Sequence, residues 1–359
     1  MITKVHIKGY KSIRDQEIDL KAINILIGGN GIGKTNFIST FSLMRSLYDK
    51  ELQSYVLKKG GANTLLYMGK KQTQQISLDL YFNHGEYQNR YIVNLQESQD
   101  RLIIDETRTA FYSAGKWHFQ SCDKSVEEAT IQNDRLGQAW YVNPLMKQFD
   151  VYHFHDAGDT SPMKGFSSLH DNVSLKKDGS NIAAFLYYLQ EKHPTYFQRI
   201  EKTVESVSPF FGSFCLEPNR LNPETIRLEW KQKGAEDTYF NAYQLSDGTL
   251  RFICLATLLM QPEPPATIII DEPELGLHPV AVNKLAALIR KASLKSQIII
   301  STQSVNLVDN FNADDIIVVD MKENASWFHR LDPEHLKVWL DEYSVGDIWE
   351  KNLIGGQPY

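Results

Sequence analysis

Hydrophobic positions follow the period of a strand in one part of the chain and the period of a helix in others. The strand-like part lies in the first third of the chain. Between about residues 75 and 120, apolar and polar residues alternate, which is typical of strands that bury one face. One such run contains Ile76, Leu78, Leu80 and Phe82. Turn residues interrupt the alternation, so the pattern predicts an antiparallel meander at about 72–120.

Short runs of mostly apolar residues occur on both sides of this region and predict strands that are buried on both faces. The runs are Ile23 to Ile27, Ala266 to Ile270, Gln297 to Ile300 and Ile316 to Val319. Segments whose apolar residues recur at helical spacing lie between several of these runs, and one of them follows Pro279. Strands that alternate with helices indicate an α/β fold with a mostly parallel sheet.

The pattern between residues 125 and 211 is mostly helical, with a loop at 153–177. Because sheet-forming segments lie on both sides of it, we interpret 125–211 as a helical arm inserted into one core. The predicted core comprises 1–124 and 212–330, and the predicted C-terminal tail is 331–359.

Composition narrows the class of protein. The chain has 359 residues, of which 42% are hydrophobic and 23% charged, so it can bury a large core. No apolar run is long enough for a membrane span, and the first residues lack a signal-peptide core. The 3 cysteines lie far apart, which favours a cytoplasmic location without a disulfide framework. The formal net charge of −6 restricts any contact with nucleic acid to a local patch.

The segment Gly28 to Thr35 fits the phosphate-binding loop pattern G-x-x-x-x-G-K-[ST]. Glycines let consecutive backbone N–H groups point at phosphates, the lysine supplies a charge, and the threonine hydroxyl binds Mg²⁺. A glycine-rich turn with a chance lysine is the alternative, but a buried strand precedes the loop and an amphipathic helix follows it. We expect ATP to contact Asn30, Gly31, Gly33, Lys34, Thr35 and Asn36.

Two acids end the apolar run at Ile270. Ligands of α/β proteins bind at the carboxyl edge of the sheet, which is where Asp271 and Glu272 would lie. We expect Asp271 to orient Mg²⁺ and Glu272 to act as the base that polarises the attacking water. A solvated acid pair would be the commoner outcome for these two residues alone, but not beside a phosphate-binding loop.

A third motif, Leu245 to Arg251, opens a helix that is apolar nearly all round. Ser246 and Gly248 at the N-terminus of this helix make an anion site, because free N–H groups and the helix dipole both attract negative charge. An ordinary helix cap is the alternative. The order of the three motifs favours the anion site.

These motifs resemble the RecF/SMC/OLD-like branch of the ABC-type ATPases, and the resemblance covers roughly two-thirds of the chain. It is carried by Lys34 to Asn36, Leu245 to Gly248 and Asp271 to Pro279. Within this branch the chain is similar to short ATPases of bacterial anti-phage and mobile-element operons. The family implies a homodimer around ATP, in which Ser246 of one chain touches the γ-phosphate held by the other.

The same resemblance concerns two further segments. Lys11 and Arg14 match the family's segment near the nucleotide, so they are either phosphate or base contacts or ordinary surface charge. The family implies that Glu274 to Pro279 crosses the dimer interface.

The chain departs from the family at two positions. Gln303 stands where these ATPases carry a switch histidine, and a glutamine cannot carry a proton as imidazolium. We therefore expect slow or partner-stimulated hydrolysis. The other departure is Tyr152 to Asp156, where His153, His155 and Asp156 form a possible metal site. The favoured alternative is a strand end that couples the arm to the nucleotide.

Too few residues separate Lys34 from Asp271 for coiled-coil arms, and about 40 residues after Val319 are too few for a Toprim domain. The resulting hypothesis is an ATP-hydrolysing switch that controls a separate nuclease chain (Toprim-like) or nucleic acid, in anti-phage defence. A RecF-like ATPase that clamps DNA is the alternative. A transporter subunit is disfavoured, because it would need a membrane partner and a switch histidine.

Two surface features each allow two interpretations from the sequence. Lysine and arginine clusters indicate either a solvated face or a nucleic-acid groove; they lie at 58–59, 70–71, 176–177, 231–233 and 284–295. Trp339 and Trp349 in the tail either pack back onto the core or form a partner surface.

Overall fold

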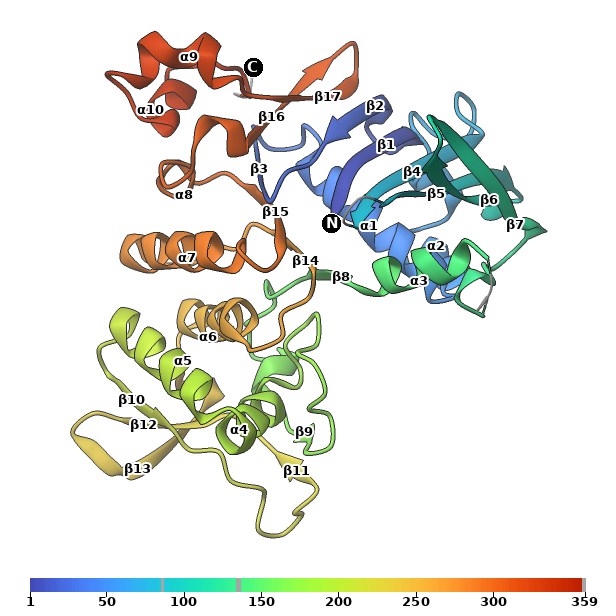
Figure 1. The fold of residues 1–359 in the computed structure, drawn as a ribbon. Coiled ribbons are helices and arrows are strands. Elements are labelled where there is room, and N and C mark those ends of the chain that lie inside the picture. Colours follow the sequence, from blue (N-terminus) through green and yellow to red (C-terminus); the bar gives the residue numbers. More distant parts are fainter. Residues whose placement is uncertain (85–86, 134–136, 357–359) are drawn as a thin grey trace.

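The computed structural model describes residues 1–84, 87–133 and 137–356, and its two largest sheets have six strands each, with helices packed against them (Figure 1). One sheet has the strand order β17-β16-β3-β15-β14-β8, and all of its pairs are parallel except that of β16 with β17. Its strands are β3 (Ile23–Ile27), β8 (Phe149–Tyr152), β14 (Thr267–Asp271), β15 (Gln297–Thr302), β16 (Ile316–Lys322) and β17 (Ala325–Arg330). The predicted α/β class with a mostly parallel sheet is confirmed.

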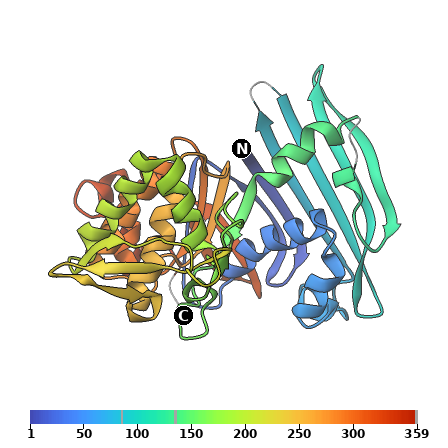
Figure 2. The same cartoon turned by 90° about the horizontal axis from the view of Figure 1, so that it is seen from below.

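The second sheet is antiparallel, with the order β2-β1-β4-β5-β6-β7. Its strands are β1 (Ile2–Tyr10), β2 (Ile13–Asp19), β4 (Gln75–His84), β5 (Tyr87–Ser98), β6 (Arg101–Ser113) and β7 (Lys116–Val126). The predicted meander corresponds to β4–β7. The N-terminal hairpin extends it, because β1 pairs with β4 (Figure 2).

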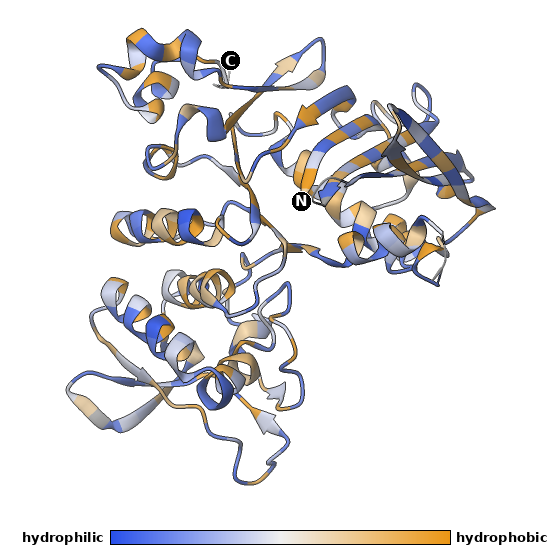
Figure 3. Ribbon diagram, in the orientation of Figure 1, coloured by the Kyte–Doolittle hydropathy of each residue, from blue (hydrophilic) through white to orange (hydrophobic). Residues whose placement is uncertain are grey.

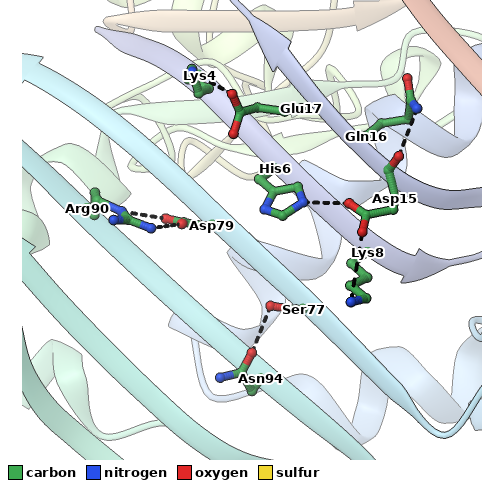
Figure 4. Close-up of polar contacts among 10 residues, drawn as sticks. All are labelled: Lys4, His6, Lys8, Asp15, Gln16, Glu17, Ser77, Asp79, Arg90 and Asn94. Carbon is green, nitrogen blue, oxygen red and sulfur yellow. Dashed lines mark hydrogen bonds and ion pairs between the residues drawn. The ribbon is translucent and has the colours of Figure 1, made fainter.

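Alternation in the antiparallel sheet gives one polar face (Figure 4). On that face Lys4 Nζ lies 2.6 Å from Glu17 Oε1, and Asp79 pairs with Arg90. The opposite face packs on α1 (Lys34–Tyr48), α2 (Leu52–Lys58) and α3 (Ala139–Lys147). The Lys4–Glu17 pair is partly exposed, and surface pairs of this kind contribute up to about 1 kcal/mol each, so burial of the apolar face holds the sheet in place.

The parallel sheet separates two hydrophobic cores, and its strands feed both. In β14, Ile268 and Ile270 belong to one core and Ile269 to the other; in β3, Ile25 and Leu26 divide in the same way. Figure 3 shows these strands as hydrophobic along most of their length. Continuous apolar runs are therefore what this position in the fold requires.

The segment 125–211 is less uniformly helical than its sequence pattern indicates. It holds α3, α4 (Ile182–Lys192) and α5 (Pro194–Val207), but β8 joins the parallel sheet as an edge strand beside β14. A run of four residues is too short for periodicity to identify it as a strand. The boundaries of the proposed core, arm and tail remain a prediction.

Helices α4 and α5 pack in one core with α6 (Asp247–Met260) and α7 (Pro279–Ala292). Short strands cover them as two small sheets, β10-β12-β13 and β11-β9. These strands are β9 (Ser167–Ser168), β10 (Phe211–Phe214), β11 (Thr225–Ile226), β12 (Glu229–Gln232) and β13 (Ala235–Asn241).

Three helices complete the C-terminal part: α8 (Val305–Val308), α9 (Pro333–Leu340) and α10 (Val345–Glu350). Trp349 is 5% exposed and packs onto the core, whereas Trp339 is 43% exposed. Across the described ranges, none of the helices is both long and apolar enough to cross a membrane.

Candidate functional site

The phosphate-binding loop connects β3 to α1, and its backbone requires glycine. Gly28 and Gly33 have φ of 149° and 115°, and Gly33 caps the N-terminus of α1. A Cβ atom on Gly33 would lie 2.0 Å from Ser326 Oγ and 2.7 Å from Ser12 Oγ. The left-handed backbone and the close neighbours both exclude a side chain at this position.

Lys34 is buried beneath this loop. Its Nζ atom donates hydrogen bonds to the carbonyl oxygens of Gly28 and Gly29, at 2.7 and 2.8 Å. Burial lowers the pKa of Lys34, and the carboxylates of Glu272, Asp271 and Glu274 oppose that effect. The structure therefore brings the loop lysine close to the acids that follow β14.

The ends of β14 and β15 bring together the two residues predicted to act in hydrolysis. The Gln303 amide donates a hydrogen bond to Glu272, although the two residues lie 31 positions apart. The Ser301 hydroxyl likewise donates to Asp271. Glu272 has a φ of 42°, an unusual backbone conformation that turns the chain at the strand end. Parallel pairing of β14 with β15 produces this juxtaposition.

Glu274 has a role that the motif analysis did not identify. Its Oε1 atom accepts hydrogen bonds from Thr302 Oγ1 at 2.6 Å and from the backbone N–H of Gln303 at 3.2 Å. Its Oε2 atom is buried and has no hydrogen-bond partner among the described residues. Burial raises the pKa of Glu274, while these hydrogen bonds act in the opposite direction. Glu274 thus fixes the backbone that carries Gln303.

Ser12 and Ser326, which were not predicted as site residues, hold the phosphate-binding loop in place. Ser326 Oγ in β17 donates to the carbonyl oxygen of Ile32 at 2.6 Å and contacts Ser12 Oγ at 2.6 Å. Asn36 Nδ2 donates to Ser12 Oγ at 2.7 Å, so this predicted nucleotide contact is held by the protein. Thr35 is exposed at the start of α1. Its hydroxyl and the Asp271 carboxylate are the oxygen ligands expected for Mg²⁺, and their role stays a prediction.

The two basic residues of the N-terminal hairpin differ in their surroundings. Lys11 Nζ donates to Ser39 Oγ in α1 at 2.9 Å, and burial together with the charge of Lys59 lowers the pKa of Lys11 to about 8. Arg14 lies in an exposed ion pair with Glu323, at 3.1 Å. Both side chains are engaged within the protein, and their contact with a nucleotide stays a prediction.

The cap of α6 is exposed. Ser246 Oγ accepts a hydrogen bond from the Thr249 amide at 3.1 Å, and Ser246 and Asp247 face solvent. A Cβ atom on Gly248 would lie 2.3 Å from the carbonyl oxygen of Gly276. In the ranges that the structure describes, no hydrogen bond or ion pair joins residues 245–251 to the loop 28–35 of the same chain.

Arg251 connects this cap to two other segments. Its guanidinium donates to the carbonyl oxygens of Leu275, at 2.7 Å, and of His155. The His153–Asp156 segment therefore contacts α6 through its backbone. No cluster of three His, Cys, Asp or Glu side chains suited to a metal occurs in the described parts of the chain.

Several of the predicted basic clusters lie in ion pairs. Lys70 pairs with Asp100, Lys176 with Asp171, Lys177 with Asp150, and Lys233 with Glu205. This arrangement agrees with a solvated face at these positions.

Comparison with known proteins identifies the fold and the family. No curated protein matches the chain. The SMC head bound to the C-winged helix domain of ScpA aligns with a TM-score of 0.61 and 18% identity, over 94% of this chain and 99% of that chain. The Pyrococcus furiosus Smc head with an extended coiled coil, bound to the C-terminal domain of ScpA, aligns with a TM-score of 0.57 and 16% identity, over 95% and 98%.

At these identities the two structures share the fold with this chain. The family model described as "AAA domain, putative AbiEii toxin, Type IV TA system" matches residues 23–309. The predicted resemblance to RecF/SMC-like ATPases without coiled-coil arms is confirmed, and the chain belongs to this family of AAA-domain proteins.

Proposed function

We propose that this protein is an ATP-dependent switch that closes as a homodimer and reopens after slow hydrolysis. The observation that carries the proposal is the hydrogen bond from Gln303 to Glu272, formed where two strands end beside the phosphate-binding loop. It joins Glu272, which we propose as the general base, to Gln303, which stands where related ATPases are expected to carry a switch histidine.

The residues present suit ATP and Mg²⁺. The loop is open at Gly31, where a built Cβ atom would meet no atom within 4 Å, and Lys34 provides a buried ammonium group in the same loop. Bound ATP supplies the phosphoanhydride bond, and Mg²⁺ neutralises phosphate charge. Lys34 would exchange its loop carbonyls for phosphate oxygens, while Thr35 and Asp271 would hold the metal.

Hydrolysis would depend on Glu272. Its carboxylate would orient a water molecule and accept a proton from it. Gln303 keeps Glu272 in place and can donate a hydrogen bond, but it carries no titratable proton in the physiological range. This limitation supports slow hydrolysis that a partner accelerates.

The homodimer follows from the exposure of the α6 cap. Ser246 and the free N–H groups of this helix attract an anion, yet the cap makes no polar contact with its own phosphate-binding loop. Two chains related by a twofold axis would each place this cap at the partner's nucleotide, which creates two composite sites.

The effector is proposed to be a separate nuclease chain of the Toprim-like type, with direct contact to nucleic acid as a second route of control. The family description, with its toxin and antitoxin terms, supports a defence role. The similar SMC heads were each solved with a bound domain of a second protein, which supports control of a partner.

Light scattering tests the switch. With ATP, Glu272→Gln should have the mass of a dimer because it binds but does not hydrolyse, whereas Lys34→Ala should stay a monomer. Glu263→Gln, an exposed acid away from the site, should behave as the unchanged protein. Equal masses for Glu272→Gln and Lys34→Ala, with and without ATP, would reject the switch.

A further inference from the structure

A cavity of about 550 Å³ opens beside the phosphate-binding loop, and the C-terminal part of the chain forms one of its walls. The loop side consists of Gly28, Gly29 and Asn30. The segment after β15 contributes Gln303 and Val305, and the C-terminal segment contributes Trp349, Glu350 and Gly356. We call residues 344–356 the C-terminal wall.

One end of the C-terminal wall is fixed directly against the loop. The Gly356 amide donates to Asp320 Oδ1 at 2.5 Å, and a Cβ atom on Gly356 would lie 3.3 Å from Gly28 Cα. The Trp349 indole N–H donates to the Gly356 carbonyl oxygen at 3.4 Å. This end of the C-terminal wall therefore packs directly against the first glycine of the loop.

The other end of the C-terminal wall packs on α8. The Gly346 amide donates to Asp309 Oδ1 at 2.7 Å, and a Cβ atom on Gly346 would lie 2.6 Å from Val305 Cγ1. Helix α8 begins two residues after Gln303. The C-terminal wall thus contacts both the loop and the segment that carries Gln303.

The cavity adjoins the residues that we propose to act in hydrolysis. Gln303 lines it and donates a hydrogen bond to Glu272. The two glycines that line it also provide the carbonyl oxygens held by Lys34 Nζ. A third phosphate on the loop would therefore approach this cavity, whereas a diphosphate would leave it open.

Glu350 gives the C-terminal wall a negative charge at this cavity. Its side chain is exposed, and no ion pair of Glu350 is found in the described residues. The neighbouring Lys351 forms no ion pair with Glu350 in the part of the chain that the structure describes, and its Nζ atom lies over the Tyr343 ring, 4.9 Å from the centroid. A carboxylate here repels the charge of a third phosphate.

We propose that the C-terminal wall is part of the nucleotide site and that Glu350 lowers the affinity for a triphosphate relative to a diphosphate. Arrival of the third phosphate displaces the wall, and its contacts with α8 and Gly28 link that displacement to the loop and to Gln303. The inference rests on the proposed function, since it requires a nucleotide at the loop.

Tryptophan emission tests the placement of the wall. The experiment uses a Ser246→Ala background, so that dimer closure does not contribute, and compares ADP with a non-hydrolysable ATP analogue. Trp349→Phe should remove most of the emission change that the analogue causes. Trp339→Phe is the matched control, because Trp339 is 43% exposed and does not line the cavity.

Nucleotide titration in the same background tests the charge. Glu350→Gln should raise the affinity for the analogue relative to ADP by about two- to fivefold at low salt, and the gain should shrink at high salt. Glu342→Gln, an exposed acid outside the cavity, should leave the ratio unchanged.

The outcomes separate the inference from the proposed function. If both nucleotides bind but the Trp349→Phe emission change and the Glu350→Gln affinity ratio equal those of the controls, the inference is wrong and the switch stands. If neither nucleotide binds to the unchanged chain, the proposed function fails and the inference fails with it.

Discussion

Single residues of the phosphate-binding loop differ in how strictly they require glycine. Gly31 has a φ of 77° but no atom within 4 Å of a built Cβ, whereas Gly33 is surrounded by serine hydroxyl groups. Alanine at either position would be strained by the backbone, and only at Gly33 would it also collide with neighbours. The crowded glycine is therefore the sensitive one.

Gly33→Ala should lower the free energy of unfolding by about 1–3 kcal/mol and abolish nucleotide binding, because the loop must shift away from Ser326 and Ser12. Urea unfolding and nucleotide titration measure the two effects. Gly31→Ala is the control and should lose less on both. Equal losses for the two variants would contradict a steric cause.

Glu274 provides a pH-dependent prediction. Burial raises its pKa above the ordinary value of 4.5, so the folded state binds a proton more tightly than the unfolded chain. Ionisation of the buried Glu274 carboxyl group therefore lowers the free energy of unfolding. This loss is absent below about pH 4.5 and is complete once the pH has risen through the pKa of Glu274 in the folded state. Glu274→Gln keeps an oxygen acceptor for Thr302 and has no charge to bury.

The difference in melting temperature between Glu274→Gln and the unchanged protein should grow in favour of the variant as the pH rises from about 4 to 8. Thermal unfolding over this pH range measures it, with the exposed Glu263→Gln as control. A constant difference would show that the Glu274 carboxyl does not titrate differently in the folded state.

The sequence identifies site residues when they belong to one continuous motif. Lys34 and the acids Asp271 and Glu272 were predicted in this way, and the structure brings them within electrostatic reach of one another. Ser12 and Ser326 were missed because they lie 314 positions apart and only the tertiary fold joins them. A hydroxyl group in a turn, as at Ser12, or in a strand, as at Ser326, has no sequence signal of its own.

At the scale of elements, β8 shows why local pattern was insufficient. Its four residues form a strand because β14 offers a free edge with parallel register from Thr267 to Ile270. The long strands and helices were predictable from period, whereas this edge strand depends on a partner more than one hundred residues away. The pairing places the segment that follows β8 beside α6.

Arg251 connects α6 to the segment that follows β8. Its guanidinium joins α6 to the backbone at Leu275 and at His155. Lysine cannot donate in two directions from a planar group, so Arg251→Lys should lose one of these two hydrogen bonds and lower the free energy of unfolding by about 0.5–1.5 kcal/mol. Urea unfolding measures the loss. Arg220→Lys, whose side chain is 92% exposed, should be neutral, and a comparable loss there would remove the argument.

At the scale of the whole molecule, no hydrogen bond or ion pair joins the two halves of the proposed site within the described residues of one chain. The phosphate-binding loop and the acids lie at the carboxyl ends of β3 and β14, while Ser246 lies exposed at the start of α6. A single chain therefore offers an incomplete site, and closure by a second copy is the simplest way to complete it.

Mixing two inactive variants tests this closure. Lys34→Ala removes the loop cation and Ser246→Ala removes the cap hydroxyl, so each variant alone should lack ATPase activity. In a dimer of one chain of each kind, one site combines both defects and the other combines an intact loop with an intact cap. Neither variant is expected to pair with itself, so the mixed dimer is the one that forms, and one of its two sites is intact. An equimolar mixture should therefore recover up to about half of the unchanged activity. If the mixture stays as inactive as its components although mixed dimers form, Ser246 acts within its own chain.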